Sequence, residues 1–105
     1  MTKKFSEIAD AAKATWSAGA RELYDGALAT FEAERTARIA LGAEVASARR
    51  ASGLTQVDLA ERSGVDQAEI SRVERGASNP TATTLVRLSS ALGRRITLEP
   101  VVASG

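Results

Sequence analysis

A short segment beyond the middle of the chain carries side chains with the chemistry needed to read base pairs. At helical spacing, one face of this segment presents Gln67, Ala68, Ser71, Arg72 and Arg75. Glutamine can bond adenine through two hydrogen bonds, arginine can bond guanine in the same way, and alanine can contact the methyl group of thymine. The same face also fits an ordinary solvated helix surface, since polar helix faces are common. The spacing alone leaves both interpretations open.

Two capping patterns predict where this helix and its neighbour begin. Thr55 is followed three residues later by Asp58, and Asp66 is followed three residues later by Glu69. In each pair the first side chain can accept a hydrogen bond from the N3 amide, and the N3 carboxylate can accept one from the amide of the cap residue. The sequence therefore predicts two short helices, over residues 56–63 and 67–75.

The residues between and within these two helices predict a tight turn. Gly64 gives the backbone freedom for a sharp reversal, and Val65 can pack inside the corner. Ile70 and Val73 face inward on the second helix, opposite the polar set. Gly76 stands where a left-handed C-cap belongs. The pattern predicts a pair of locked helices that presents the polar face of the second one.

A longer helix is predicted upstream of this pair, over residues 39–52. The helical pattern from about Phe31 can run into this segment without a break. Gly26 and Gly42 each weaken a helix interior by about 1 kcal/mol relative to alanine, so hinges are plausible at both positions. The inward face of the predicted helix is formed by Leu41, Val45 and Ala48.

Downstream, the pattern predicts a last helix and then a strand. Thr81, after Asn79 and Pro80, can cap the helix, and Gly93 closes it. From residue 95 to 99 apolar and polar side chains alternate and β-branched residues are present, which predicts a short strand. A lone strand needs a partner, and the same strand of a second subunit or an edge on another protein could supply it. The apolar face of the helix is formed by Leu85, Leu88 and Leu92.

Composition limits the classes of function. The 105 residues are one domain's worth, with 44% hydrophobic and 4% aromatic residues, which predicts a modest and mostly aliphatic core. Cysteine and histidine are absent, which excludes disulfides and thiolate metal sites, and no cofactor is expected. An enzyme is disfavoured, because there is also no glycine-rich phosphate loop and no supported carboxylate pair. No segment is apolar enough to cross a membrane, and a cytoplasmic setting is expected.

The formal net charge of +1 is weak evidence for a nucleic-acid partner, because most non-specific affinity comes from neutralised phosphates. Beyond residue 39 every cation is an arginine, which suits bidentate contacts with guanine and phosphate. A GC-rich genome explains the same bias equally well. Tight binding by a near-neutral protein predicts a dimer or a larger complex.

All aromatic residues lie in the N-terminal arm, at Phe5, Trp16, Tyr24 and Phe31. They fall within two runs of apolar residues at helical spacing, before and after Gly19. Such an arm either folds back to complete its own core or offers a surface to a partner protein, since aromatic residues are enriched at binding hot spots.

Residues 41–92 resemble the Xre-type helix-turn-helix family, which includes the lambdoid phage repressors and Cro proteins. The resemblance implies that Gln67, Ala68, Ser71 and Arg72 face base edges of double-stranded operator DNA. The motif residues are Leu54-Thr55-Gln56, Leu59-Ala60, Gly64-Val65, Gln67, Ile70-Ser71-Arg72, Glu74, Gly76 and Asn79-Pro80.

The same resemblance implies roles for residues around the recognition helix. Gln56 would grip a phosphate, which also agrees with the free amides of a helix N-terminus. Arg75 and Asn79 would add backbone contacts. Arg49 and Glu74 would form a structural ion pair, with Arg49 also placed to touch phosphate. The implied fold is all-α, a five-helix domain with an N-terminal helical arm and a short C-terminal β-strand.

The arm contains Glu22-Leu23-Tyr24-Asp25 and Phe31, and the chain ends its last helix with Leu92-Gly93-Arg94-Arg95-Ile96-Thr97-Leu98. Together with the Xre-type block, these segments resemble HigA-type antitoxins. This resemblance implies a homodimeric repressor of its own operon that neutralises a HigB or RelE-like ribonuclease toxin. The implied domains are a toxin-binding arm over 1–38, the DNA-binding domain over 39–94, and a dimerisation strand and tail over 95–105. The toxin-binding candidates are Phe5, Trp16, Tyr24 and Phe31. The alternative is a stand-alone Xre regulator whose arm serves dimerisation or packing.

Overall fold

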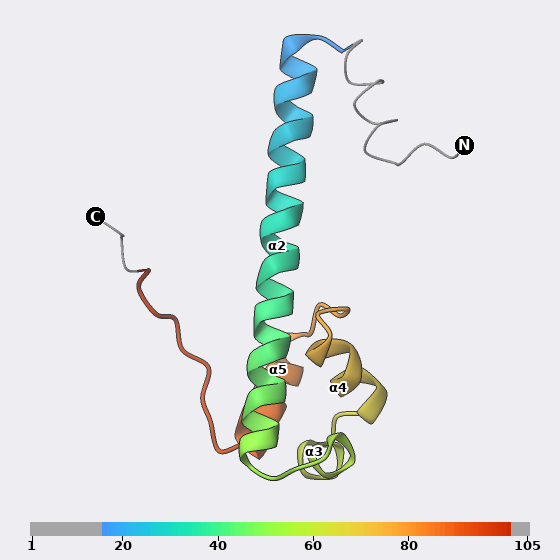
Figure 1. Cartoon of the computed structure of the whole chain (residues 1–105), viewed down its shortest axis with the longest axis vertical. Coiled ribbons are helices and arrows are strands. Elements are labelled where there is room, and N and C mark those ends of the chain that lie inside the picture. The colour runs from blue at the N-terminus through green and yellow to red at the C-terminus, as the bar shows by residue number, and fades with distance from the viewer. Residues whose placement is uncertain (1–15, 102–105) are drawn as a thin grey trace. The chain divides into compact units, whose positions relative to one another are not determined.

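The computed structural model describes residues 16–101, so the predictions for Phe5 and its neighbours lie outside the described part. The chain divides into two compact units, residues 1–34 and residues 35–105. Between residues 16 and 101 the structure has four helices and no strand (Figure 1). They are α2 (Ala18–Ala51), α3 (Gln56–Ser63), α4 (Gln67–Glu74) and α5 (Ala82–Ala91).

Helix α2 is one continuous helix of 34 residues. The predicted run from Phe31 into residues 39–52 is therefore confirmed, whereas the hinges at Gly26 and Gly42 are wrong. Gly42 is buried, and a Cβ atom there would lie 2.2 Å from the carbonyl oxygen of Val73. Glycine is needed at this position because the backbones of α2 and α4 approach closely, and a side chain would separate them.

The capping pattern at α3 is confirmed. The Thr55 side chain accepts a hydrogen bond from the Asp58 amide, and the Asp58 carboxylate accepts one from the Thr55 amide at 2.9 Å. The helix ends at Gly64, which has the left-handed φ of 73° and donates its N–H to Ala60. This residue allows the chain to reverse and start α4 three residues later.

The capping prediction for α4 is wrong in its side-chain part. Asp66 occupies the N-cap position, but its side chain makes no capping hydrogen bond. The Glu69 carboxylate is instead bound by Ser78 and Arg72. At the other end, Gly76 has a φ of 70° as predicted, and the Ala77 and Gly76 amides close a Schellman motif onto Arg72 and Val73.

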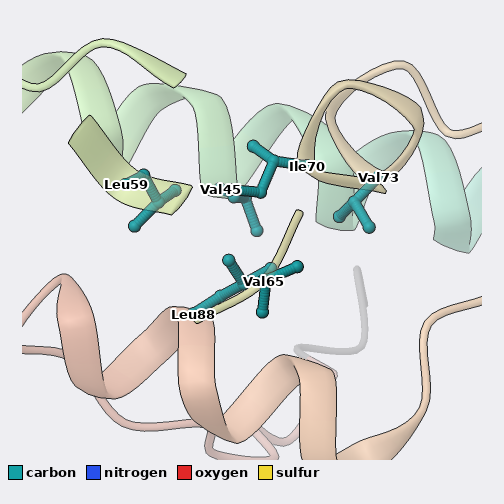
Figure 2. Close-up of a cluster of buried hydrophobic side chains, with 6 residues drawn as sticks. All are labelled: Val45, Leu59, Val65, Ile70, Val73 and Leu88. Carbon is teal, nitrogen blue, oxygen red and sulfur yellow. The ribbon is translucent and has the colours of Figure 1, made fainter. Parts of the chain in front are cut away.

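A small aliphatic core lies within the described part of the second unit. Leu59 of α3 and Ile70 of α4 are fully buried. Because Val65 lies in the turn between these helices, it packs into the same cluster and fixes the corner. The core joins α2, α3, α4 and α5, and Figure 2 shows its central side chains: Val45, Leu59, Val65, Ile70, Val73 and Leu88.

Helix α5 follows the predicted cap, since the Thr81 side chain accepts a hydrogen bond from the Thr84 amide. The strand predicted over residues 95–99 is wrong, because no strand occurs between residues 16 and 101. A strand is defined by hydrogen bonds to a neighbour, and no second strand is present in the described chain to pair with this segment.

The five-helix expectation is also wrong, because the domain predicted over residues 39–94 contains the C-terminal part of α2 followed by α3, α4 and α5. None of the described helices is long and apolar enough to span a membrane.

Candidate nucleic-acid interface

Helix α4 separates a buried face from an exposed polar face. Ile70 and Val73 are 0% and 2% exposed and anchor the helix on the core. The base-reading candidates lie outside this buried face: Gln67, Ala68 and Arg72 are exposed and Ser71 is half-buried. The structure therefore brings all the sequence-predicted base readers together on the solvent side of one helix.

A carboxylate at the end of α4 connects three helices. Arg49 of α2 donates to Glu74 through Nε at 2.8 Å and through Nη2 at 2.9 Å. Gln56, the first residue of α3, donates to the same carboxylate through Nε2 at 3.2 Å. Arg49 also donates from Nη1 to the backbone oxygen of Leu54 at 2.9 Å. The predicted pairing of Arg49 with Glu74 is present, and its side chains are only 11% and 6% exposed.

The electrostatics of this cluster favour the ionised pair. Burial would raise the pKa of Glu74, but hydrogen bonds from Arg49 and Gln56 outweigh this and hold the pKa below its usual value. The hydrogen bond to Glu74 raises the pKa of Arg49. Because partly buried ion pairs give little net stability, the main effect of the pair is to fix α4 relative to α2 and α3.

The phosphate candidates differ in how they are placed. Gln56 lies at the N-terminus of α3, where backbone amides face outward, and Glu74 orients its side-chain amide. Arg75 and Asn79 are exposed, and Arg75 donates through Nε to the Ser71 carbonyl at 3.2 Å. Arg49 is occupied by Glu74 and Leu54, so its geometry is that of a structural residue.

One functional contact was missed by the sequence analysis. The Glu69 carboxylate accepts a hydrogen bond from Ser78 at 2.6 Å and forms an ion pair with Arg72 at 2.8 Å. The spacing of Glu69 and Arg72 by three residues was a signal for an ion pair on one helix face. The contact with Ser78 depends on the path of the loop after α4, which the spacing does not reveal.

In the arm, the structure brings two of the toxin-binding candidates together. The rings of Trp16 and Tyr24 meet edge to face, with centroids 5.1 Å apart and planes at 72°. Phe31 is 57% exposed. Leu23, which was not among the candidates, is 78% exposed and lines an open groove with Phe31, Glu22 and Glu34. Phe5 lies outside the described residues.

Known proteins share the helix-turn-helix part of this chain. Residues 45–98 match the helix-turn-helix family. An uncharacterized HTH-type transcriptional regulator of Haemophilus influenzae is 37% identical over 68 residues, which cover 65% of this chain and 69% of that protein. The HTH-type regulator y4dJ of Sinorhizobium fredii is 47% identical over 53 residues, covering 50% of this chain and 69% of the relative.

A solved structure is also similar, that of the restriction-modification controller protein C.AhdI from Aeromonas hydrophila. The TM-score is 0.56 at 32% identity, and the match covers 57% of this chain and 91% of the controller protein. The fold and these relatives define a DNA-binding transcriptional regulator. The chain belongs to the Xre-type helix-turn-helix family.

Proposed function

We propose that this regulator represses its own operon by placing α4 in the major groove of a palindromic operator. In proteins with this motif, the N-terminal residues of the second helix contact base edges. Gln67 and Ala68 occupy this end of α4, and Arg72 lies one turn further along. The observation that carries the proposal is the exposure of these side chains opposite a fully buried Ile70.

The residues around α4 complete the proposed DNA contact. Gln56 binds a phosphate through its side-chain amide and the free amides at the start of α3. Arg75 and Asn79 bind further phosphates from the end of α4 and the following loop. Arg49 makes only a secondary contact with the DNA backbone, because its guanidinium is bound by Glu74.

A second copy of the chain is part of this proposal. A net charge of +1 provides little non-specific attraction to DNA. Two recognition helices that bind successive half-sites supply the missing affinity, and a two-fold dimer matches a palindromic site. Sedimentation of the chain with and without DNA measures this stoichiometry.

The DNA-binding part of the proposal is tested by selecting duplexes from a randomised pool with the purified chain. Arg72→Ala is expected to weaken binding to the selected duplex by about 1–3 kcal/mol and to relax preference at one base position. Arg87→Ala removes an exposed arginine of α5 and is the control for loss of charge. Equal preference in wild type and Arg72→Ala would remove Arg72 from the base-reading set.

We further propose that the regulator is a HigA-like antitoxin whose arm, residues 1–38, binds a HigB or RelE-like ribonuclease toxin. The support is the exposed apolar surface of the arm, with Leu23 and Phe31 beside the carboxylates of Glu22 and Glu34. A ribonuclease binds a polyanion through cationic residues, and an acidic rim around an apolar centre complements such a surface. The paired rings of Trp16 and Tyr24 lie in the same arm.

Co-expression of the tagged chain with its neighbouring genes, followed by pull-down, tests the antitoxin role. Recovery of a small basic protein that arrests growth when it is expressed alone is the expected result. A homodimer that binds its own promoter but recovers no such protein would identify a stand-alone regulator and contradict the antitoxin proposal.

A further inference from the structure

The carboxylate of Glu69 lies between the loop after α4 and the exposed arginine of the recognition helix. Its Oε1 atom accepts a hydrogen bond from Ser78 Oγ at 2.6 Å. Its Oε2 atom accepts from Arg72 Nε at 3.2 Å and from Arg72 Nη2 at 2.8 Å. One side chain thus ties the loop to α4 with one oxygen and holds the arginine with the other.

This arrangement decides which edge of the guanidinium is presented. An arginine has five N–H donors in a planar fork. Glu69 occupies one on Nε and one on Nη2. The outer donors of Nη1 and Nη2 remain on the far edge, and they are parallel. Two parallel donors are what the O6 and N7 acceptors of guanine require.

The ion pair with Glu69 also sets the direction in which the Arg72 side chain extends along α4. Glu69 lies in the first turn of α4, one turn nearer to the helix N-terminus than Arg72. The ion pair therefore draws the guanidinium toward the end of the helix that carries Gln67 and Ala68. This is the end that contacts base edges in helix-turn-helix proteins.

The charge of Glu69 has a second effect. The hydrogen bond from Ser78 and the pairing with Arg72 hold the pKa of Glu69 below its usual value, so the group is a carboxylate at neutral pH. An anion beside the guanidinium lowers its attraction for phosphates, which carry no sequence information. Arg72 then gains less from non-specific duplexes than an unpaired arginine.

We propose that Glu69 is a positioning residue for sequence readout: anchored by Ser78, it holds Arg72 edge-on for guanine and keeps it from phosphates. The proposal rests on the proposed base-reading role of Arg72. Glu69 touches no base in this arrangement, and it acts through the arginine.

The test uses the duplex that the wild-type chain selects from a randomised pool, its single-base variants, and a random duplex, each titrated at several salt concentrations. Glu69→Gln is expected to reduce discrimination about tenfold at the base pair read by Arg72 and at no other. It is expected to bind the random duplex more tightly and to steepen its salt dependence by about one ion. Ser78→Ala is expected to change discrimination in the same direction by a smaller factor, without altering charge.

The matched control is Glu61→Gln. Glu61 is an exposed carboxylate on α3, and its replacement changes the net charge by the same amount. It is expected to leave discrimination at every base pair unchanged. Because Glu69 and Glu61 lie outside the core, circular dichroism of both variants is expected to match that of the wild type.

The double variant Arg72→Ala with Glu69→Gln separates positioning from direct contact. It is expected to show the preference of Arg72→Ala alone, because Glu69 has no arginine left to position. Further relaxation at another base pair would mean that Glu69 itself reads a base, which overturns the proposal.

The failure of this inference is distinguishable from that of the proposed function. If Arg72→Ala keeps the wild-type preference, the base-reading role of Arg72 is wrong. If Arg72→Ala relaxes one position while Glu69→Gln and Ser78→Ala do not, base reading stands and the positioning role is wrong. A change in Glu69→Gln alone would remove Ser78 from the proposal.

Discussion

At the scale of single residues, the carboxylate of Glu74 connects α4 to both α2 and α3. Its carboxylate receives hydrogen bonds from Arg49 of α2 and Gln56 of α3, while the residue itself ends α4. The contact holds α4 against α2 and α3, and it also orients Gln56, the residue proposed to bind a phosphate. A change in this one side chain is therefore expected to affect both stability and DNA binding.

Glu74→Gln is expected to lower the free energy of unfolding by about 1–3 kcal/mol at neutral pH, because Arg49 then keeps its charge in a largely buried site without an anionic partner. The pKa of Glu74 is lowered in the folded chain, so its ionised form stabilises the fold above the unfolded value, near 4.3. This contribution is lost as the pH falls through the folded pKa. Urea titrations from pH 7 down to acid should therefore show the gap between wild type and Glu74→Gln closing.

Glu61→Gln controls for the loss of one negative charge in that experiment. Its stability at neutral pH is expected to match that of the wild type. A gap between wild type and Glu74→Gln that stays constant down to the lowest pH would contradict the assignment to the ionised carboxylate.

At the scale of elements, the packing of α2 against α4 depends on Gly42. Its missing side chain allows the helix to approach the carbonyl oxygens of Val73 and Glu74. Helix propensity would favour alanine in this position. The close approach reverses this preference, which is why a residue that weakens isolated helices is placed inside a long one.

Gly42→Ala is expected to destabilise the packing of α2 against α4 by about 1–3 kcal/mol, because a Cβ there would clash with the carbonyl oxygen of Val73 and force the helices apart. Gly26→Ala is the matched control, since a Cβ there meets nothing within 4 Å. Thermal unfolding followed by circular dichroism measures both variants. Equal melting temperatures for Gly42→Ala and Gly26→Ala would show that the two helices can separate without loss.

The sequence predicted the elements whose causes are local. The box at Thr55 and Asp58 needs only residues of one turn, and it is present. The pattern at Asp66 and Glu69 has the same spacing, yet the Glu69 carboxylate is bound by Ser78, nine residues further on. Residues 95–99 alternate as a strand does, but pairing needs a neighbour that the local pattern cannot supply.

Much of the proposed site could be read from the sequence for the same reason. Helical geometry alone places four side chains on one face of α4: Gln67, Ala68, Ser71 and Arg72. The burial of Ile70 shows that the opposite face of the helix packs on the core. The pairing of Arg49 with Glu74 was predicted from a family resemblance and not from the periodicity of the sequence. The closeness of Gln56 to Glu74 depends on the packing angle between helices, which no spacing encodes.

At the scale of the whole molecule, the chain carries two different exposed surfaces. The polar face of α4 suits a nucleic acid, whereas the arm presents Leu23 and Phe31. These surfaces belong to different compact units of the chain. If each binds its own partner, as proposed, substitutions in one are expected to leave the other partner's binding unchanged.

The double variant Leu23→Ala with Phe31→Ala is expected to weaken capture of the proposed toxin by about tenfold or more, because it removes the aromatic anchor at Phe31 and the apolar contact beside it. Binding to the selected duplex is expected to remain at the wild-type level. Val86→Ala, which truncates an apolar side chain of α5 that is 56% exposed, is the control. Pull-down and duplex titration of the same protein samples measure both properties.

Loss of DNA binding in the arm variant would contradict the division of labour between the two surfaces. Unchanged toxin capture would place the toxin contact elsewhere in the chain. Either result can be read independently of the other, since the two measurements use different partners.

The small aliphatic core has a consequence for the lifetime of the protein in a cell. The free energy of unfolding of ordinary domains is only about 5–15 kcal/mol. A core centred on six aliphatic side chains therefore predicts a low free energy of unfolding for this one. Unfolded copies are removed continuously by proteases. DNA binds only the folded form and lowers the unfolded fraction. If the chain binds an operator as proposed, copies on the DNA are expected to be degraded more slowly than free copies, so the half-life of the regulator should rise with the occupancy of that site.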